Sequence, residues 1–319
     1  MRRKAEGIAS LPLFVSGWEN IKVMLVFLIQ RIKESNKVGY LFVAPFVVYF
    51  SIFFAYPLIF SFYLTFHKWS IISPHKPYVG LQNYVKLVTD PLFRTTVKNT
   101  LFFLVMFVLG AIIISLSIAM LLNMRIRFRG AFRILYFLPI VTLDVAVALV
   151  WSWIFSSDYG LLNHFLLKTG IVPQGWLINE RLAMLSIAIT CIWRWIGYFT
   201  IIFLAALQTI PKEYHEAAML DGAGSWHIFR HITLPLLNPM ITLAIIVATI
   251  NGLQLFTEPY LMTKGGPSNS TLSIVYYMYN TGFRYLSMGY ASTIGIALFI
   301  FIMMVVLLER KVVERRIEF

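Results

Sequence analysis

Long apolar segments alternate with short polar and basic segments along the chain. Six windows contain few or no charged residues and are long enough for a helix to cross the hydrocarbon core of a bilayer, which takes about 20 residues. They lie at 38–66, 99–122, 134–155, 182–207, 240–262 and 290–308. We therefore expect six membrane-spanning helices. An even number places both ends of the chain on one side of the membrane.

The composition supports an integral membrane protein. Of the 319 residues, 59% are hydrophobic, 13% are charged, and the mean hydropathy is +0.76, whereas charged residues make up about a quarter of an ordinary soluble domain. The fold class that we expect is all-α. A single cysteine, Cys191, excludes both an intramolecular disulfide and a thiolate metal cluster.

The positive charges predict how the chain is oriented. A net charge of +13 in a soluble protein would suggest nucleic acid, but here Lys and Arg lie between the apolar windows and no nucleic-acid motif is present, so we expect no such partner. Seventeen Lys and Arg residues fall in segments 1–37, 123–133, 208–239 and 309–319. Nine fall in the other loops, which connect the apolar windows on the opposite side. Cytoplasmic loops carry the excess of Lys and Arg. We therefore expect both termini and segment 208–239 to be cytoplasmic.

The two ends of the chain are basic extensions. Residues 1–37 lack a small-residue cleavage site after their apolar part, so they do not fit a signal peptide. We interpret them as a cytoplasmic extension with an interfacial amphipathic helix, and an additional spanning helix is the alternative. Residues 309–319 form a basic cytoplasmic tail.

Segment 208–239 is mostly polar and lies between two apolar windows. Pro211 can open a helix, and Glu213 places a negative charge near the positive end of its dipole, which predicts a short helix over 211–220. Gly222 and Gly224 should end that helix, and Ser225 should cap a second one. A bent pair of short helices, held outside the membrane, is the structure that we expect.

Seven residues in this segment match a longer pattern at every spacing: Glu216, Ala217, Ala218, Gly222, Ile232, Leu234 and Pro235. The pattern is the EAA motif of the permease subunits of bacterial ATP-binding-cassette (ABC) importers, which the chain resembles. Further strings are similar to the carbohydrate-uptake branch that includes the maltose and glycerol-phosphate permeases: GLQNY at 80–84, FLP at 137–139, WRWIGY at 193–198, LAALQ at 204–208, IP at 210–211 and TKGGP at 263–267. The resemblance covers about 38–308.

The resemblance implies a six-span, type I ABC importer transmembrane domain with a cytoplasmic coupling helix pair, in a bacterial inner membrane. It also implies a second related permease subunit, two copies of an ABC ATPase, and a periplasmic or lipoprotein solute-binding protein that delivers a sugar or oligosaccharide. The chain has no G-x-x-x-x-G-K-[ST] phosphate loop. We therefore expect no catalytic residue, cofactor or metal here, and ATP and Mg on the partner ATPase.

The same resemblance places Glu216 in a groove of the ATPase. Without the motif, Glu216 would be interpreted as an ordinary solvent-exposed glutamate. Around it, small residues allow a close approach and aromatic residues offer apolar anchors. The residues expected to couple to the ATPase are Glu216, Ala217, Ala218, Asp221, Gly222, Trp226 and Phe229.

Ionisable groups inside the apolar windows indicate a second site, because such groups usually face a cavity, a partner or a pathway. Asp144 could pair with Arg194, and Glu258 is expected near the outer end of its span, close to water. The fifth window is polar and is interrupted by Gly252 and Pro259. In the resembled branch it borders the substrate path, for which the candidates are Arg194, Asn251, Gln254, Glu258, Tyr260, Trp193 and Asp144. The alternatives are snorkelling or interhelical pairing for the ionisable residues, interhelical hydrogen bonding for the other polar residues, and a position at the membrane interface for Trp193.

Other classes of function fit less well. A secondary transporter or a channel would show proton-relay acids or inverted repeats, and a membrane enzyme would show a metal cluster or a nucleophile with its base. His215, His227 and His231 lie in the expected helix pair without such a scaffold. For the cargo, Arg194 and the basic composition would suit an acidic oligosaccharide such as alginate fragments. Because Arg194 also belongs to the family-like WRWIGY string, a neutral sugar stays open.

Overall fold

The chain divides into two units, Met1–Phe60 and Ser61–Phe319, whose described residues are mostly helical. The computed structural model describes residues 39–40, 42–124 and 129–313. Within these ranges the β structure is limited to one isolated bridge between His67 and Tyr78. The all-α prediction is therefore confirmed, and the expected interfacial helix in 1–37 lies outside the described residues.

The first unit contributes most of one apolar helix. This helix runs over Phe42–Leu64 and includes η1 (Ser51–Ala55) and α2 (Tyr56–Leu64). Within residues 42–60 none of the side chains is buried. A helix that is apolar on all sides suits a lipid environment.

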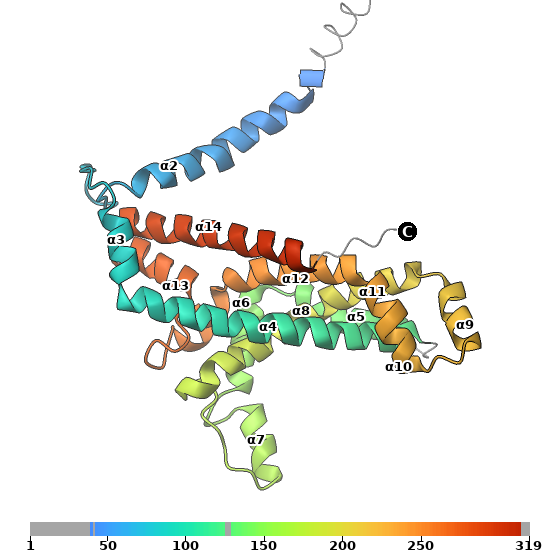
Figure 1. Cartoon of the computed structure of the whole chain (residues 1–319). Helices are drawn as coiled ribbons and strands as arrows, with labels where there is room; N and C mark the ends of the chain where they lie inside the picture. The colour runs from blue at the N-terminus through green and yellow to red at the C-terminus, as the bar shows by residue number, and fades with distance from the viewer. Residues whose placement is uncertain (1–38, 41, 125–128, 314–319) are drawn as a thin grey trace, which may run out of the picture. The chain divides into compact units, whose positions relative to one another are not determined.

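The second unit is built around two long helices, α4 (Pro91–Asn123) and α8 (Glu180–Thr209), which pack along each other. α5 (Arg129–Val141) packs on α8, α12 (Asn238–Leu253) on α4, and α14 (Met288–Val313) on α12 (Figure 1). Phe103 and Phe107 of α4 and Phe199 and Phe203 of α8 are almost completely buried in the core. The interior therefore lies between the helices, and their outer faces are apolar.

Shorter elements complete the second unit. They are α3 (Gln82–Thr89), α6 (Asp144–Ile154), α7 (Leu161–Lys168), α9 (Lys212–Leu220), α10 (Ser225–Ile228), η2 (Phe229–Thr233), α11 (Leu234–Leu236), η3 (Pro259–Thr263), α13 (Ile274–Tyr279) and η4 (Asn280–Arg284). The end of α4 that adjoins α3 lies opposite the end near α9 and α10 (Figure 1). The segment with the EAA residues and the loop after the first window therefore occupy opposite ends of the long helices.

By length and composition, the described part contains four helices able to cross a membrane, or up to six if each of two bent pairs counts as one span. The four are Phe42–Leu64, Pro91–Asn123, Glu180–Thr209 and Met288–Lys311. The bent pairs are Ile134–Val141 with Asp144–Ile154, at 108°, and Ser225–Leu236 with Asn238–Leu253, at 67°. Six crossings stay a prediction, but the third window is not a straight helix.

The fifth window differs in detail from expectation. α12 includes Gly252 and ends at Leu253, and the chain is non-helical at Leu255 and Phe256 before it turns into η3. Gly252 therefore does not interrupt the helix; a Cβ there would come within 2.8 Å of Leu104 Cδ1 and 3.2 Å of Phe107 Cδ1. Gly252 allows α12 to approach α4 closely. A glycine with this role and a glycine that interrupts a helix look the same in the sequence.

A hydrogen-bonded aspartate fixes the start of α4. Asp90 is its N-cap: one carboxylate oxygen accepts from the backbone N–H of Leu92 at 2.9 Å. The other accepts from the hydroxyls of Tyr277 in α13 and Tyr290 in α14, each at 2.6 Å. Burial raises the pKa of the Asp90 carboxyl, but these tyrosine and backbone hydrogen bonds outweigh it, so the pKa lies below its ordinary value. The carboxylate therefore joins three helices.

We predict that Tyr277→Phe and Tyr290→Phe each lower the free energy of unfolding by about 1.5–3 kcal/mol, the usual contribution of a hydrogen bond to a charged group. A lowered folded pKa stabilises the protein above the ordinary value of 3.8, and this contribution is lost as the pH falls through the folded value. Unfolding of the detergent-solubilised protein should thus show a smaller acid dependence in the double variant. Tyr285→Phe, at a tyrosine that is 69% exposed, is the control. Equal pH profiles in wild type and double variant would contradict this prediction.

A second prediction concerns the contact between α5 and α8. A Cβ at Gly197 would overlap the backbone carbonyl of Tyr136, and backbone cannot move aside as a side chain can. We expect Gly197→Ala to cost about 1–3 kcal/mol of stability, as overpacking does. Gly224→Ala is the matched control, because a Cβ there meets nothing within 4 Å. The measurement is thermal unfolding of both variants, and equal melting temperatures would refute the close contact.

Candidate functional site

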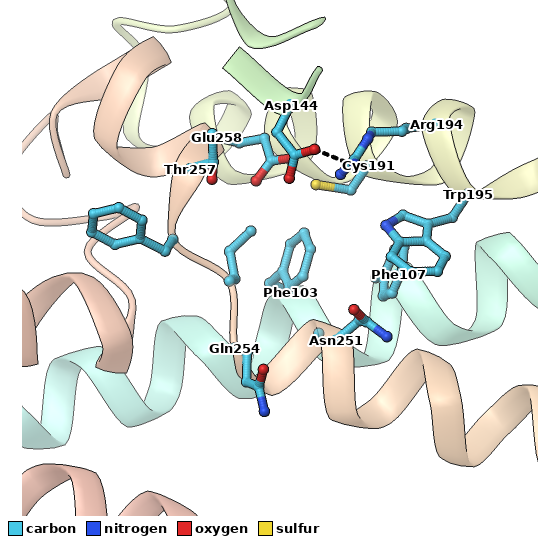
Figure 2. Close-up of a pocket in the computed structure, with 13 residues that line it drawn as sticks. Phe103, Phe107, Asp144, Cys191, Arg194, Trp195, Asn251, Gln254, Thr257 and Glu258 are labelled. Carbon is cyan, nitrogen blue, oxygen red and sulfur yellow. Dashed lines mark hydrogen bonds and ion pairs between the residues drawn. The ribbon is translucent and has the colours of Figure 1, made fainter. Parts of the chain in front are cut away.

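A cavity of about 270 Å³ lies where the two central helices meet the break in the fifth window. Its polar and aromatic walls come from α4, α6, α8, the end of α12 and the segment after it, as Figure 2 shows. The lining residues are Phe103, Phe107, Asp144, Cys191, Arg194, Trp195, Asn251, Gly252, Gln254, Leu255, Phe256, Thr257 and Glu258. The lining combines aromatic side chains with a few convergent polar groups, which is typical of a binding site.

An ion pair forms one wall of the cavity. The Arg194 guanidinium donates to the Asp144 carboxylate, so the pair that the sequence left open is present. Arg194 lies in the middle of α8, and Asp144 is the first residue of α6, directly after the bend. The Arg194 side chain is 12% exposed and the Asp144 side chain 48%. Arg194 Nε is buried and makes no hydrogen bond to any described residue.

Glu258 is placed differently from expectation. It was expected near water, but its residue is only 6% exposed, and its carboxylate faces the same cavity as Asp144 and Cys191 (Figure 2). The reason is the course of the chain after α12, which turns at Gln254 and returns as η3 against α6 and α8. Glu258 precedes Pro259 at the start of η3 and is thereby carried inside.

Five of the seven candidate path residues line the cavity: Arg194, Asp144, Asn251, Gln254 and Glu258. The other two, Trp193 and Tyr260, are not among the lining residues. Trp193 is 42% exposed and meets Trp151 edge-on at 5.5 Å. Tyr260 stacks on Phe256 at 5.3 Å. Both are therefore engaged in aromatic packing beside the cavity.

Sequence reasoning missed several lining residues that carry no charge. Cys191 lies three residues before Arg194, a spacing that places both on one helix face and could have indicated it. Phe103 and Phe107 are four apart and stack at 5.5 Å. Nothing in the apolar second window distinguishes these two rings from other core residues, so only the structure places them at the cavity.

The polar segment between α8 and α12 has the expected bent shape. None of the nine residues of α9 is buried. Gly222 has a φ of +79°, the left-handed backbone that glycine adopts at little cost, and Ala223 N–H donates to the Ala218 carbonyl at 2.9 Å. The prediction that Ser225 caps the second helix is wrong. Ser225 is the first helical residue of α10, and the extended Gly224 precedes it without a side-chain cap.

This segment exposes apolar side chains on both of its helices. Leu220 is 89% exposed, Trp226 is 70% and Met219 is 58%. The Trp226 ring lies 5.4 Å from that of Phe229. Apolar groups gathered on a polar segment are typical of a surface that binds a partner. Glu216, in the middle of α9, is exposed as well.

One side-chain hydrogen bond ties the two halves of the segment together. His215 Nε2 of α9 lies 3.2 Å from Thr233 Oγ1 at the end of η2. His227 and His231 stack on each other at 4.0 Å, with His231 Nδ1 near the His227 carbonyl. Among the described residues, no group of three or more His, Cys, Asp or Glu side chains could hold a metal ion.

A family model described as "Binding-protein-dependent transport system inner membrane component" matches residues 111–319, which is more than half of the chain. The chain belongs to this family. The matched region contains the whole EAA segment and every lining residue of the cavity except Phe103 and Phe107. The family resemblance is thereby confirmed: the chain is an inner membrane component of a binding-protein-dependent transport system, and the alternative of a secondary transporter or channel is not favoured.

Several permeases align with this chain over most of their own length. The lactose transport system permease LacF of Rhizobium radiobacter is 40% identical over 287 residues, 88% of this chain and 94% of the relative. The arabinooligosaccharides permease AraP of Bacillus subtilis is 38% identical over 275 residues, 85% and 87%. The trehalose/maltose permease MalF of Thermococcus litoralis is 33% identical over 282 residues, 88% and 94%.

A solved structure shows the same fold. A chain of a bacterial ABC transporter involved in the import of the acidic polysaccharide alginate aligns with a TM-score of 0.77 at 24% identity, covering 90% of this chain and 99% of that one. The expected fold, an ABC importer transmembrane domain of type I, is confirmed.

The left-handed glycine gives a prediction for this permease. Gly222→Ala should strain the bend by about 1–2 kcal/mol, the cost of a left-handed conformation for an L-residue. Gly224→Ala should cost much less, because Gly224 has a φ of −73°. Hydrogen exchange of α9 amides in the purified permease would report the difference. Equal exchange in both variants would show that the bend does not depend on Gly222.

Proposed function

We propose that this permease is a subunit of an ATP-driven importer for a sugar or oligosaccharide. A second related permease, two copies of an ABC ATPase and an extracytoplasmic solute-binding protein complete the transporter. The observation that carries the proposal is α9: a helix with no buried residue that holds Glu216, Ala217 and Ala218 of the EAA pattern. ATP and Mg would bind the ATPase, while this chain moves and performs no covalent chemistry.

The relatives support a sugar as cargo. Those described above, at 33–40% identity, are named for lactose, arabinooligosaccharides and trehalose/maltose. The cavity is compatible with such a cargo. Rings such as Trp195 can pack against the apolar face of a sugar, and Asn251 and Gln254 offer amide donors and acceptors to its hydroxyls.

The charge distribution supports the orientation. Seventeen Lys and Arg residues on one side against nine on the other support a cytoplasmic position for both termini and α9. Cytoplasmic α9 would be on the side where ATP is hydrolysed. In the same orientation the end of α12 that carries Asn251 points away from the cytoplasm.

A continuous helical path links the coupling segment to the cavity. α10, η2 and α11 lead through a 67° bend into α12, whose far end carries Asn251 next to Gln254. Sixteen helical residues span about 24 Å as a stiff rod. A displacement of α9 and α10 by the ATPase would therefore move the amide wall of the cavity relative to the Arg194–Asp144 wall. This is a physical basis for alternating access.

We predict that Glu216→Arg leaves the permease folded in the membrane and lowers sugar-stimulated ATP hydrolysis by the assembled transporter at least tenfold, the effect of losing about 1.4 kcal/mol of coupling. The matched control is Glu213→Arg, which makes the same charge change in the first turn of α9 outside the EAA pattern. The measurement is ATPase activity in proteoliposomes with loaded solute-binding protein. Wild-type stimulation in Glu216→Arg would remove α9 from the proposed role.

A further inference from the structure

The charges that line the cavity do not sum to a positive value. Arg194 is the only Lys, Arg or His among the lining residues, while Asp144 and Glu258 are both carboxyl groups. The formal sum is −1 when Glu258 is ionised and zero when it is protonated. The basic composition of the whole chain therefore does not extend to the cavity.

The single cation is already neutralised. The Arg194 guanidinium is paired with Asp144, and its side chain is mostly buried. A carboxylate on an incoming sugar would have to share the guanidinium with the Asp144 carboxylate. Asp144 and Glu258, which lie side by side at the cavity (Figure 2), would both repel it. Unlike and like charges at contact distance differ by several kcal/mol in a partly dry site. An acidic sugar therefore meets a barrier here that a neutral one does not.

The remaining lining groups suit hydroxyls and apolar ring faces. Carboxylates of Asp144 and Glu258 can accept from sugar hydroxyls, and the buried Arg194 Nε still has an unused donor. Amide groups of Asn251 and Gln254 serve as donors and acceptors, and Trp195 provides an aromatic surface. These groups recognise an uncharged polyol without any net charge on the ligand.

We propose that Asp144 determines charge selectivity: by neutralising Arg194 it makes the cavity accept neutral sugars and reject acidic ones such as uronates. This rests on the proposed function, because it assumes that cargo passes through the cavity. Arg194 would favour an acidic cargo only if its guanidinium were free, and here it is paired with Asp144.

The chain supplies its own probe for this test. Cys191 is the one cysteine in the sequence and lies in the cavity wall beside Arg194 and Glu258. The complete transporter, cycling with ATP in membrane vesicles, would be treated with a cationic or an anionic methanethiosulfonate of similar size. Modification of the Cys191 peptide would be followed by mass spectrometry, with Cys191→Ser as the blank. The ratio of the cationic to the anionic rate is divided by the same ratio for a small thiol in solution. The result reports the electrostatic potential at the Cys191 sulfur.

We expect the wild type to react faster with the cationic reagent. Asp144→Asn should shift the ratio about tenfold toward the anionic reagent, the effect of roughly one unit charge at short range in a hydrated site. Asp144→Glu, which keeps the charge, should retain the wild-type ratio. Arg194→Gln should shift the ratio in the opposite direction and serves as the second variant if Asp144→Asn does not fold. A wild-type preference for the anionic reagent, an unshifted ratio in Asp144→Asn and Arg194→Gln, or no modification of Cys191 at all would each overturn the proposal.

A transport experiment then tests selectivity itself. Uptake of a neutral oligosaccharide and of a uronate oligosaccharide of equal length would be compared, after direct measurement that the solute-binding protein binds both. Asp144→Asn should raise the uptake ratio of acidic to neutral sugar several-fold, and equal ratios would refute the inference. Protection of Cys191 by transported sugar separates the two proposals. Without protection, the cargo does not pass through the cavity, so this inference fails while the importer function, which is tested by Glu216→Arg, is unaffected. Protection with an unchanged uptake ratio contradicts only the role of Asp144.

Discussion

A guanidinium in the middle of an apolar helix has to be neutralised at close range, because an isolated charge at membrane depth is strongly unfavourable. Arg194 meets this requirement through Asp144. For the carboxylate to reach it, the chain bends by 108° between Ile134–Val141 and Asp144–Ile154. Gly197 allows α5 to lie against α8 on the same side, since any larger residue would overlap the Tyr136 carbonyl. The ion pair and Gly197 thus determine how the chain before and after the bend lies against α8.

The two functional regions of the chain are joined by two helices: α8, which carries Arg194 and ends at Thr209 just before α9, and α12. The EAA segment and the cavity share α12, which starts at the coupling side and ends at Asn251 and Leu253. Gly252 lets this helix lie close to Leu104 and Phe107 of α4. Because α12 is rigid and tightly packed at its far end, a displacement of its first turn would also displace Asn251 in the cavity wall. A flexible loop in the same place would not transmit such a displacement.

The sequence predicted best what depends on local chemistry. Apolar length located the helices, and the left-handed Gly222 bend followed from glycine being the residue that adopts this backbone at little cost. Ser225 was misjudged because Gly224 supplied an extended residue before the helix without a side-chain cap. The burial of Glu258 depends on the reversal of the chain after Gln254, and Phe103 and Phe107 become lining residues through packing with α12. Such long-range effects leave no trace in the spacing of residues.

The fold and the cargo of this permease are set by different residues. The chain has the backbone arrangement of an alginate importer subunit at 24% identity, yet likeness of fold does not carry ligand specificity, which is decided by a few side chains. In this cavity the decisive group is not the arginine, which the WRWIGY string supplies, but the acid that faces it. Asp144 lies just beyond the bend, on a helix separate from the EAA segment and from α12. A change of charge at that position would alter what the cavity accepts and leave α9, the Gly222 bend and the α12 rod intact. Coupling and selectivity are therefore open to independent variation in this architecture.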